Sequence, residues 1–469
     1  MKKNHSIDMC HGSLADKILF FALPLMASSL LQLLFNAADV VVVGRFAGKE
    51  ALAAVGSNTS LINLLINLFV GLSVGTNVVV SRDLGAKRYD NVSRGVHTAM
   101  AMALASGVAM MLFGVVMVRC LLEWMSSPTD VIDLATVYLR IYFLGMPANL
   151  VYNFGAAILR AQGDTQRPLY FLTLSGVVNV LLNLVFVIGF HLDVAGVALA
   201  TIIAQYISAV LVVRCMMKEE GPLHLDLKQL GFEKKVVIQI LNVGLPAGFQ
   251  GVVFSLSNVV IQSSINSFDD SALVAGGAAA ANIENFVYVT MNAFHQAAIS
   301  FVGQNYGAAK CDRVDKVAWQ CAAFAMLFGL VFGNLAYFFG APLASIYAPG
   351  EPEVVRQALV RMLYTARPYF ICGAMEVLAG ILRGLGSSVI PMITSIMGAC
   401  VLRLVWVAAV FPLSPTPACL YVSYPISWIV TTLFHFLFLM LAVRKRAFAK
   451  VQSNGPAYLS TEGRHPEVS

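Results

Sequence analysis

Long apolar segments recur along almost the whole chain and constrain its fold more than any other feature. Each has about 20 or more predominantly apolar residues, enough for a helix to cross a hydrocarbon core of about 30 Å. Only 12% of the 469 residues are charged, about half of the share in soluble proteins. The segments lack the alternating pattern of membrane strands, so we expect helices. The chain is predicted to be an all-α polytopic membrane protein.

Twelve transmembrane helices are expected, six in each half of the chain. Their predicted ranges are 18–43, 52–80, 95–121, 132–159, 169–190, 195–216, 236–265, 273–303, 317–340, 355–382, 389–411 and 418–443. Of the 31 lysines and arginines, 23 lie in the terminal segments and in the loops expected on the same side of the membrane. Because basic loops stay in the cytoplasm, we expect both termini to be cytoplasmic and the protein to lie in a bacterial inner membrane.

Short motifs repeat at an almost constant offset, which indicates a duplicated chain. The following pairs are 222 or 223 residues apart: Ala22-Leu-Pro24 and Gly244-Leu-Pro246, Gly85-Ala and Gly307-Ala, Ala157-Ile-Leu-Arg160 and Gly380-Ile-Leu-Arg383. Six crossings return the chain to its starting side, so the halves have the same orientation, as in some secondary transporters. We expect two pseudo-symmetric six-helix bundles. These are an N-lobe (1–216) and a C-lobe (236–443), joined by a cytoplasmic linker (217–235) and followed by a cytoplasmic tail (444–469).

Asp39 is an acidic residue inside the first apolar segment. Gln32, Asn36 and Asp39 share one helix face because they are spaced at i, i+4 and i+7. A carboxylate at bilayer depth costs about 2.5 kcal/mol or more and usually faces a protein interior or a wet cavity. Asp39 either holds a neighbouring helix in place or forms a cation or proton site. We favour the site, with Gln32 and Asn36 as supporting polar groups.

Further polar residues distinguish the first half from the second. Asn179 and Asn183 lie one turn apart within 169–190, and Thr201 lies early in the next span. At the repeat offset, Asp39 and both asparagines map to apolar residues of the second half. One such residue alone could be an interhelical hydrogen bond of about 1 kcal/mol or less. The set of four indicates a site that only the N-lobe carries.

The second half has its own embedded polar residues. Glu284, His295, Glu376 and Arg403 are candidates for the lining of a substrate cavity. Because buried membrane charges tend to pair, Glu284 or Glu376 could instead form a structural ion pair with Arg367 or Arg403. The sequence leaves both interpretations open.

Motifs of enzymes and ATPases are not found. Gly71-Leu-Ser-Val-Gly75 fits a nucleophile elbow but lies inside a predicted span, where small residues serve close helix packing. The chain has no Walker lysine motif and no His-Glu-x-x-His. Its eight cysteines form no Cys-x-x-Cys pair, which argues against a zinc site. We expect no enzyme activity, no cofactor and no nucleic-acid partner.

In their order and duplication, the motifs resemble the multidrug and toxic compound extrusion (MATE) family of cation-coupled efflux transporters. The resemblance covers roughly residues 14 to 443. It is carried by Ala22-Leu-Pro24, the Asp39 end of the first span, Gly85-Ala, Gly307-Ala, Ile158-Leu-Arg-Ala-Gln-Gly-Asp164 and Gly196-Val-Ala-Leu-Ala-Thr201. The family implies two lobes around a central cavity and the export of organic cations and amphipathic drugs against an inward flow of Na+ or H+.

The resemblance also implies site residues. In the family, an N-lobe site joins an aspartate, an Asn-x-x-x-Asp pair and a threonine, which match Asp39, Asn179, Asn183 and Thr201. Many members have aspartate followed by proline where this chain has Asn183-Leu, so the second carboxylate is missing here. Other members use C-lobe acids, and Glu376 lies near one such position. Because protonation tolerates the loss of a ligand better than metal coordination does, H+ is favoured over Na+ at Asp39.

The sequence thus predicts an antiporter that exports cationic or amphipathic compounds by alternating access of two lobes. Its expected partners are small organic molecules and the lipid bilayer, and a monomer is expected. The first alternative is a flippase for a lipid-linked precursor, which would need a basic cavity built from Arg140, Arg367 and Arg403. A membrane-embedded enzyme is a more distant alternative.

Overall fold

The structure is a computed structural model that describes residues 6–47, 49–124 and 131–453, and these ranges contain helices and loops but no strand. The helices of the first half are α1 (Ala15–Phe46), α2 (Lys49–Gly85), α3 (Tyr89–Trp124), α4 (Ile132–Leu144), α5 (Met146–Gln162), α6 (Gln166–Leu184) and α7 (Asp193–Met217). Those of the second half are α8 (Lys234–Asn266), α9 (Ser271–Gly307), α10 (Cys311–Phe338), α11 (Gly340–Tyr347), α12 (Pro352–Tyr364), α13 (Tyr369–Gly384), α14 (Val389–Ser395), α15 (Leu402–Val405) and α16 (Pro417–Ser453).

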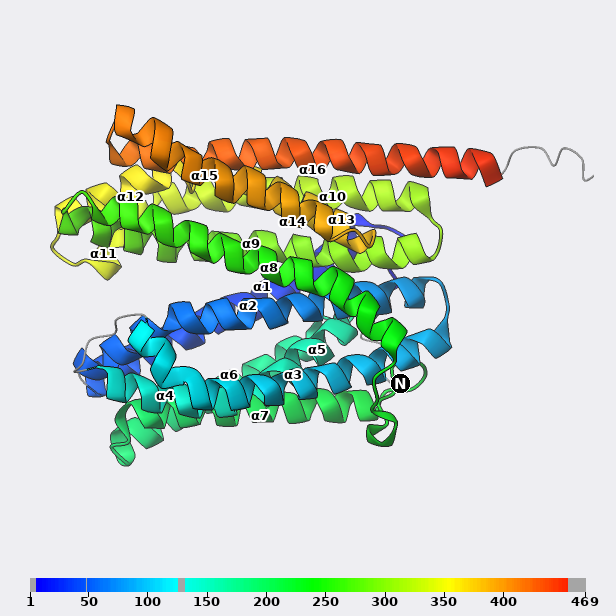
Figure 1. Ribbon diagram of the computed structural model, residues 1–469, viewed down its shortest axis with the longest axis horizontal. Helices are drawn as coiled ribbons and strands as arrows, with labels where there is room; N and C mark the ends of the chain where they lie inside the picture. Colours follow the sequence, from blue (N-terminus) through cyan, green and yellow to red (C-terminus); the bar gives the residue numbers. More distant parts are fainter. Residues whose placement is uncertain (1–5, 48, 125–130, 454–469) are drawn as a thin grey trace, which may run out of the picture.

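Twelve crossings form two six-helix bundles, as the sequence predicts. Nine helices in the described ranges are long and apolar enough to cross a membrane, and α4 with α5, bent by 46°, makes a tenth crossing. The other two are α2 and the pair α12–α13. α16 continues past the predicted end of the last span at 443, because the sequence from 444 to 453 has no glycine or proline that would end a helix. In Figure 1, α2–α7 form the lower group of helices and α9–α16 the upper group.

Two spans that the sequence predicts as continuous, 132–159 and 355–382, are broken helices. The first breaks at Gly145, and Pro147 lies in the first turn of α5. The second breaks between α12 and α13, where Pro368 directly precedes α13. Proline cannot donate a backbone hydrogen bond, but its fixed φ suits the start of a helix. Each proline therefore ends one helix and begins the next.

The two spans related by the repeat, 169–190 and 389–411, both contain wide π turns that the sequence did not predict. α6 runs into a π turn at Val185–Gly189. The other span has π turns at Ile396–Val401 and Trp406–Val410, on either side of α15. Such turns are frequent at functional sites.

α1 packs against both lobes. Its first half lies in a core cluster with α9, α10 and α13 of the C-lobe. In that cluster the ring centroids of Phe21 and Phe301 are 5.5 Å apart. Farther along α1, the ring of Phe35 lies directly against Gly176 of α6, in the N-lobe. α1 therefore packs within its own N-lobe and also connects it to the C-lobe.

α8 makes the corresponding connection from the C-lobe. Val236 and Ile240, near its start, are buried in a core cluster of the N-lobe. Ile261 and Ile265, near its end, are buried against α16 at Tyr421. Figure 1 shows α8 running from the upper group of helices to the lower group.

Glycines allow the lobes to approach each other along α2 and α8. A Cβ atom on Gly71 would lie 2.2 Å from the backbone nitrogen of Gly248, and one on Gly85 would lie 1.9 Å from the carbonyl oxygen of Gln304. Small residues let membrane helices gain backbone contact and van der Waals packing. Gly71-Leu-Ser-Val-Gly75 is therefore part of a helix interface.

Hydrogen bonds cross the same boundary. Asn77 of α2 and Ser300 of α9 exchange two hydrogen bonds of 3.1 Å. The Gln304 amide also donates to the carbonyl oxygen of Ala161 at 2.6 Å. These contacts join the lobes at the end that carries the α2–α3 and α9–α10 loops, which we call the joined end.

The segment between α7 and α8, within the predicted linker 217–235, packs against the N-lobe. Leu223 and Leu225 are buried in the same core cluster as the start of α8. The Asp226 amide donates to Nε2 of His97 at 3.0 Å. The segment therefore fixes the position at which the chain leaves the N-lobe.

Residues 6–13, which we call the N-terminal latch, lie across the boundary at the joined end. On the N-lobe side, the Ile7 amide donates to the carbonyl oxygen of Gly163 at 3.3 Å. On the C-lobe side, Met9 is fully buried in the cluster formed with α9, α10 and α13, and its carbonyl oxygen accepts from Asn305 at 3.0 Å. The latch thus contacts both lobes where they meet.

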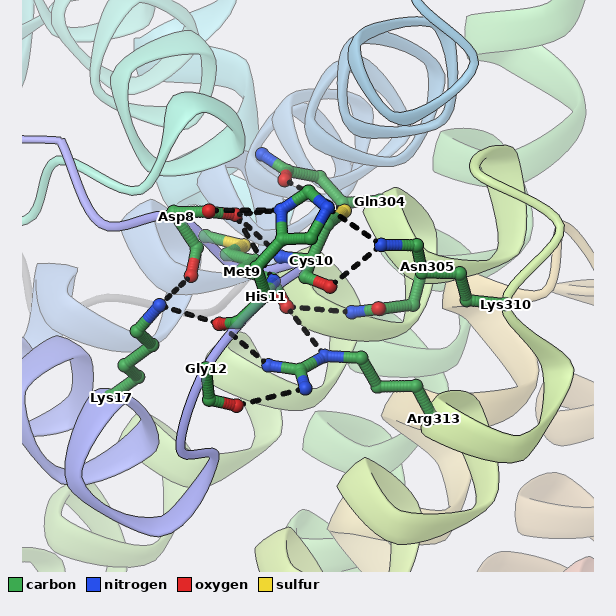
Figure 2. Close-up of polar contacts among 10 residues, drawn as sticks. All are labelled: Asp8, Met9, Cys10, His11, Gly12, Lys17, Gln304, Asn305, Lys310 and Arg313. Atoms are coloured by element: carbon green, nitrogen blue, oxygen red, sulfur yellow. Dashed lines mark hydrogen bonds and ion pairs between the residues drawn. The ribbon is translucent and has the colours of Figure 1, made fainter.

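Arg313 of α10 makes three of the bonds that hold the latch. It donates to the carbonyl oxygens of Met9, His11 and Gly12 at 3.2, 3.0 and 2.9 Å (Figure 2). Hydrogen bonds from a charged donor are about twice as strong as those between neutral groups. Arg313 is therefore the main polar anchor of the latch.

The His11 ring connects two charged neighbours. Its Nδ1 lies 3.0 Å from a carboxylate oxygen of Asp8, and its Nε2 lies 2.9 Å from Nζ of Lys310 (Figure 2). Because an ammonium group can only donate, Nε2 accepts and Nδ1 donates. Lys310 also donates to the carbonyl oxygen of Cys10 at 3.0 Å.

Replacing Arg313 with alanine is expected to open the latch. The change removes three hydrogen bonds from a charged donor, each worth about 1.5 kcal/mol or more, so the open fraction should rise at least about tenfold. Burial raises the pKa of the Cys10 thiol, which makes its reaction with maleimide slow while the latch is closed. The labelling rate of Cys10, followed by peptide mass spectrometry, therefore reports opening. Lys316→Ala, at an exposed position on the same helix, is the matched control. Equal labelling rates in the two variants would contradict the role of Arg313.

Candidate functional site

Asp39 and the two asparagines of α6 form one hydrogen-bonded cluster between α1 and α6. Nδ2 of Asn183 donates to Oδ1 of Asp39 at 2.5 Å and lies 2.9 Å from Oδ1 of Asn179. Nδ2 of Asn179 lies 3.5 Å from the other carboxylate oxygen of Asp39. Asn179 and Asn183 are buried and Asp39 is half-buried. Two neutral amides thus contact a carboxylate within a membrane-spanning segment.

One atom of this cluster has an unused bonding capacity. The side-chain carbonyl oxygen of Asn183 is buried and accepts no hydrogen bond from the described residues. A buried acceptor without a donor is costly, by about 1 to 3 kcal/mol. The nitrogen of the same amide contacts Asp39, so rotation of the amide would direct this oxygen to a proton or a small cation at the carboxylate. The cluster therefore fits a monovalent cation or a proton.

The other predicted members of this site lie apart from the cluster. The Thr201 hydroxyl donates to the carbonyl oxygen of Val197 in its own helix at 2.9 Å. Gln32 and Asn36 are exposed. Within the described ranges, none of these three side chains has a hydrogen bond to Asp39. The structure therefore brings together three of the six predicted residues.

Two tyrosines near Asp39 were missed by the sequence analysis. Tyr138 and Tyr142 of α4 stack with ring centroids 6.1 Å apart. Both phenols are within electrostatic range of the Asp39 carboxylate. Their i, i+4 spacing places them on one helix face, but it did not indicate which helix that face would meet.

In the C-lobe, Glu284 is part of a buried ion pair. Its carboxylate accepts from Nη2 of Arg361 at 3.1 Å and from the Thr365 hydroxyl. The Arg361 guanidinium also lies 5.8 Å from the ring centre of Tyr421. Glu284 was expected to pair with Arg367 or Arg403 if it paired at all, and that expectation is wrong. The partner is Arg361 of α12.

His295 and Glu376 lie in a second buried network. Nδ1 of His295 donates to the backbone carbonyl of Glu376 at 2.6 Å and is 3.8 Å from a carboxylate oxygen of the same residue. On the other side of the ring, Nη1 of Arg383 lies 3.1 Å from Nε2. Nη2 of Arg383 donates to Gln250 of α8 at 2.8 Å. Glu376 therefore has His295 as its neighbour, and not Arg367 or Arg403, which the sequence had left open as possible partners.

Arg383 is a residue whose position the sequence analysis assigned incorrectly. The sequence places it just past the predicted span 355–382, at the end of the repeated motif Gly380-Ile-Leu-Arg383. In the structure it is only 6% exposed and lies in the last turn of α13. The polar side chains of Gln250 and His295 make this burial possible, and they come from other helices.

The three arginines that the sequence placed inside spans have different surroundings. Arg140 and Arg367 are exposed, and Arg367 lies over the ring of Tyr337 with Cζ 5.3 Å from its centre. Arg403 is only 3% exposed. Its Nε donates to the Ser427 hydroxyl at 2.9 Å.

These features define the protein as a duplicated helical membrane protein, in which one of two six-helix bundles carries a carboxylate between its helices. The family model MatE matches residues 24–185 and again residues 246–408. The match covers more than half of the chain, and the chain belongs to the MATE family of transporters.

Individual relatives are similar over most of their length. The probable multidrug resistance protein YoeA of Bacillus subtilis is 26% identical over 80% of this chain and 82% of its own. A protein of Shewanella oneidensis named FAD transporter is 24% identical over 74% of this chain and 77% of its own. The crystal structure of a MATE protein in complex with MaL6 has a TM-score of 0.88 and 21% identity, covering 96% of this chain and all of that one.

Asn183→Ala is expected to lower transport activity about tenfold or more. The substitution removes the amide that contacts Asp39, and hydrogen bonds to charged groups are worth about 1.5 to 3 kcal/mol. Asn36→Ala is the matched control, because Asn36 is exposed and without a hydrogen bond to Asp39 in the described ranges. Initial rates of substrate uptake into inverted vesicles give the comparison. Equal rates for both variants would show that the Asn183 contact has no role.

Glu284→Gln is expected to destabilise the C-lobe by about 3 kcal/mol, because it leaves the buried charge of Arg361 without its counter-ion. The thermal midpoint in detergent, followed by tryptophan fluorescence, should fall by several degrees. Glu353→Gln is the matched control, since Glu353 pairs with Arg356 on the exposed surface, where ion pairs contribute little. If Glu284→Gln had the same midpoint as Glu353→Gln, the ion pair would not stabilise the lobe.

Proposed function

We propose that this protein is a secondary active antiporter that exports cationic or amphipathic organic compounds in exchange for protons. The observation that carries the proposal is the Asp39 cluster, a carboxylate within a membrane-spanning helix that contacts two asparagine amides of the same lobe. Membership of the MATE family and relatives named for multidrug resistance support small organic compounds as substrates. The relative named FAD transporter is a reason to include larger amphipathic compounds.

The arrangement of donors around Asp39 favours H+ over Na+. Na+ is a hard cation and needs several oxygen ligands, by the same logic that applies to hard divalent cations. Both asparagines direct N–H groups toward the carboxylate, and the Thr201 hydroxyl donates elsewhere. The unbonded oxygen of Asn183 is one remaining ligand. A proton needs only the carboxylate, and rotation of the Asn183 amide would supply an acceptor for it.

Exchange would occur by alternating access of the two lobes. The lobes are joined at one end by α2 and α8, by the Asn77–Ser300 pair and by the N-terminal latch. Backbone-to-backbone packing at glycines involves few long side chains, so the lobes could separate there without extensive repacking. Separation at this end would open the space between the lobes to the other side of the membrane.

We infer that the joined end faces the cytoplasm of a bacterial inner membrane. The loops and adjoining helix ends here carry Arg82, Lys87, Arg88, Lys310 and Arg313, and the cytoplasmic side is enriched in such residues. Both termini would then be cytoplasmic. In this orientation the conformation described is closed toward the cytoplasm.

No specific observation favours a lipid-linked precursor flippase. Such a protein would need a basic cavity, and Arg140 and Arg367 are exposed instead of adding to the buried charge of Arg403.

Asp39→Asn is expected to abolish coupled export, because the amide cannot take up and release a proton. Drug accumulation in efflux-deficient cells is measured with Na+ and pH varied separately and with membrane abundance matched by immunoblot. Unchanged export by this variant would contradict the proposal. If export needs Na+ at fixed pH and persists when the proton gradient is collapsed, the coupling ion is Na+ and not the proton.

A further inference from the structure

Arg403 is a buried arginine in the middle of a membrane-spanning segment. It lies on the four-residue helix α15, between two π turns of the span Val389–Leu413. It is only 3% exposed. An ionised side chain at this depth is expensive and usually serves a substrate or ion path, and π turns often mark such places.

The contacts of Arg403 leave most of its bonding capacity unused. A guanidinium has five N–H donors, and the hydrogen bond of Nε to the Ser427 hydroxyl uses one of them. Cζ lies 4.2 Å from the ring centre of Tyr424, a cation–π contact that covers one face. Within the described ranges, the two terminal nitrogens have no hydrogen-bond partner, and no carboxylate lies within 4 Å.

The other buried arginines of the C-lobe have polar partners. Arg361 pairs with Glu284, and Arg383 contacts Gln250 and His295. The C-lobe interior thus has three arginines and two glutamates, Glu284 and Glu376. Among the described residues, Arg403 has neither an ion pair nor a hydrogen bond to its terminal nitrogens, whereas the terminal nitrogens of Arg361 and Arg383 have polar partners.

Further aromatic rings lie next to Tyr424, on one side of this charge. The ring of Trp428 lies 5.3 Å from that of Tyr369 and 6.0 Å from that of Tyr424, both edge-on. Met291, Cys372 and Met375 are buried with Trp428 in one cluster. An aromatic surface beside a guanidinium suits a molecule with a planar apolar body and one anionic group, because arginine binds carboxylates and phosphates through two parallel N–H bonds.

We propose that Arg403, together with Tyr424 and Trp428, forms a subsite for the anionic group of amphipathic substrates. The inference rests on the proposed function and narrows its substrate class to include anionic and zwitterionic aromatic compounds. The ligand chemistry is a carboxylate, sulfonate or phosphate on an aromatic body. The N-lobe carboxylate would serve the coupling ion, and the C-lobe arginine would serve the substrate.

The test compares two dyes with the same xanthene core and opposite charge. Purified protein in detergent is titrated with carboxyfluorescein (anionic) and with rhodamine 6G (cationic), and binding is followed by fluorescence anisotropy. Arg403→Gln should weaken carboxyfluorescein binding at least tenfold and change rhodamine 6G binding less than twofold. Arg367→Gln, at an exposed arginine that also lies on a tyrosine ring, should bind both dyes as the unmodified protein does.

If Arg403 had only a structural role, the dye titrations would give a different result. Equal carboxyfluorescein affinities before and after Arg403→Gln would overturn the inference, and so would failure of the unmodified protein to bind this dye. If the glutamine variant does not fold, Arg403→Lys keeps the charge but loses the paired N–H groups, and it should weaken carboxyfluorescein binding at least threefold. Unchanged affinity in a folded Arg403→Lys variant would also overturn it.

Failure of the antiporter proposal can be distinguished from failure of the subsite proposal, because dye binding does not require coupled transport. Dye that binds the unmodified protein through Arg403, but is not exported from cells, would contradict the antiporter proposal and support the subsite.

Discussion

A charge that enters the bilayer must find its counter-charge or hydrogen-bond partners inside the helix bundle, and this requirement organises the C-lobe. Glu284 of α9 is held by Arg361 and Thr365 from the α12–α13 region. Arg383 of α13 is held by Gln250 of α8 and His295 of α9. These contacts tie together helices that are distant in sequence. Removal of one partner would leave a buried charge, which is why such networks fix relative helix positions strongly.

The boundary between the lobes follows a different physical rule. There the contacts include glycine against backbone, as at Gly71 and Gly248, the uncharged hydrogen bonds between Asn77 and Ser300, and a cation–π contact of Arg82 with the ring of Tyr306. Dispersion and small hydrogen bonds hold most of this surface together, so its separation breaks no buried ion pair of the described residues. Further charged groups lie in the latch, at the membrane surface, where Arg313 and Lys310 can be solvated when they are released. Strong pairing within the C-lobe and weak pairing at the boundary are the combination that rigid-body motion needs.

The two lobes share a fold but differ in the polar groups at equivalent positions. The N-lobe has a carboxylate with two amides that donate to it. The C-lobe has Arg403, on a span with π turns on either side of it, in an aromatic environment. Duplication accounts for the shared scaffold, and the residues within it give the two lobes buried polar groups of opposite charge.

The sequence by itself determined the class of fold, because hydrophobic length and loop charge are local properties that need no partner. It also identified Asp39, Asn179 and Asn183, since a polar residue in an apolar segment is visible without a structure, and the repeat showed which of them lacked counterparts. What only the tertiary structure decided was pairing. Neither Arg361 nor Arg383 was among the predicted site residues. The burial of Arg361 depends on Glu284, and that of Arg383 depends on Gln250 and His295, all from other helices. Burial of a charge is a property of its neighbours in space, and these neighbours are set by how the helices pack.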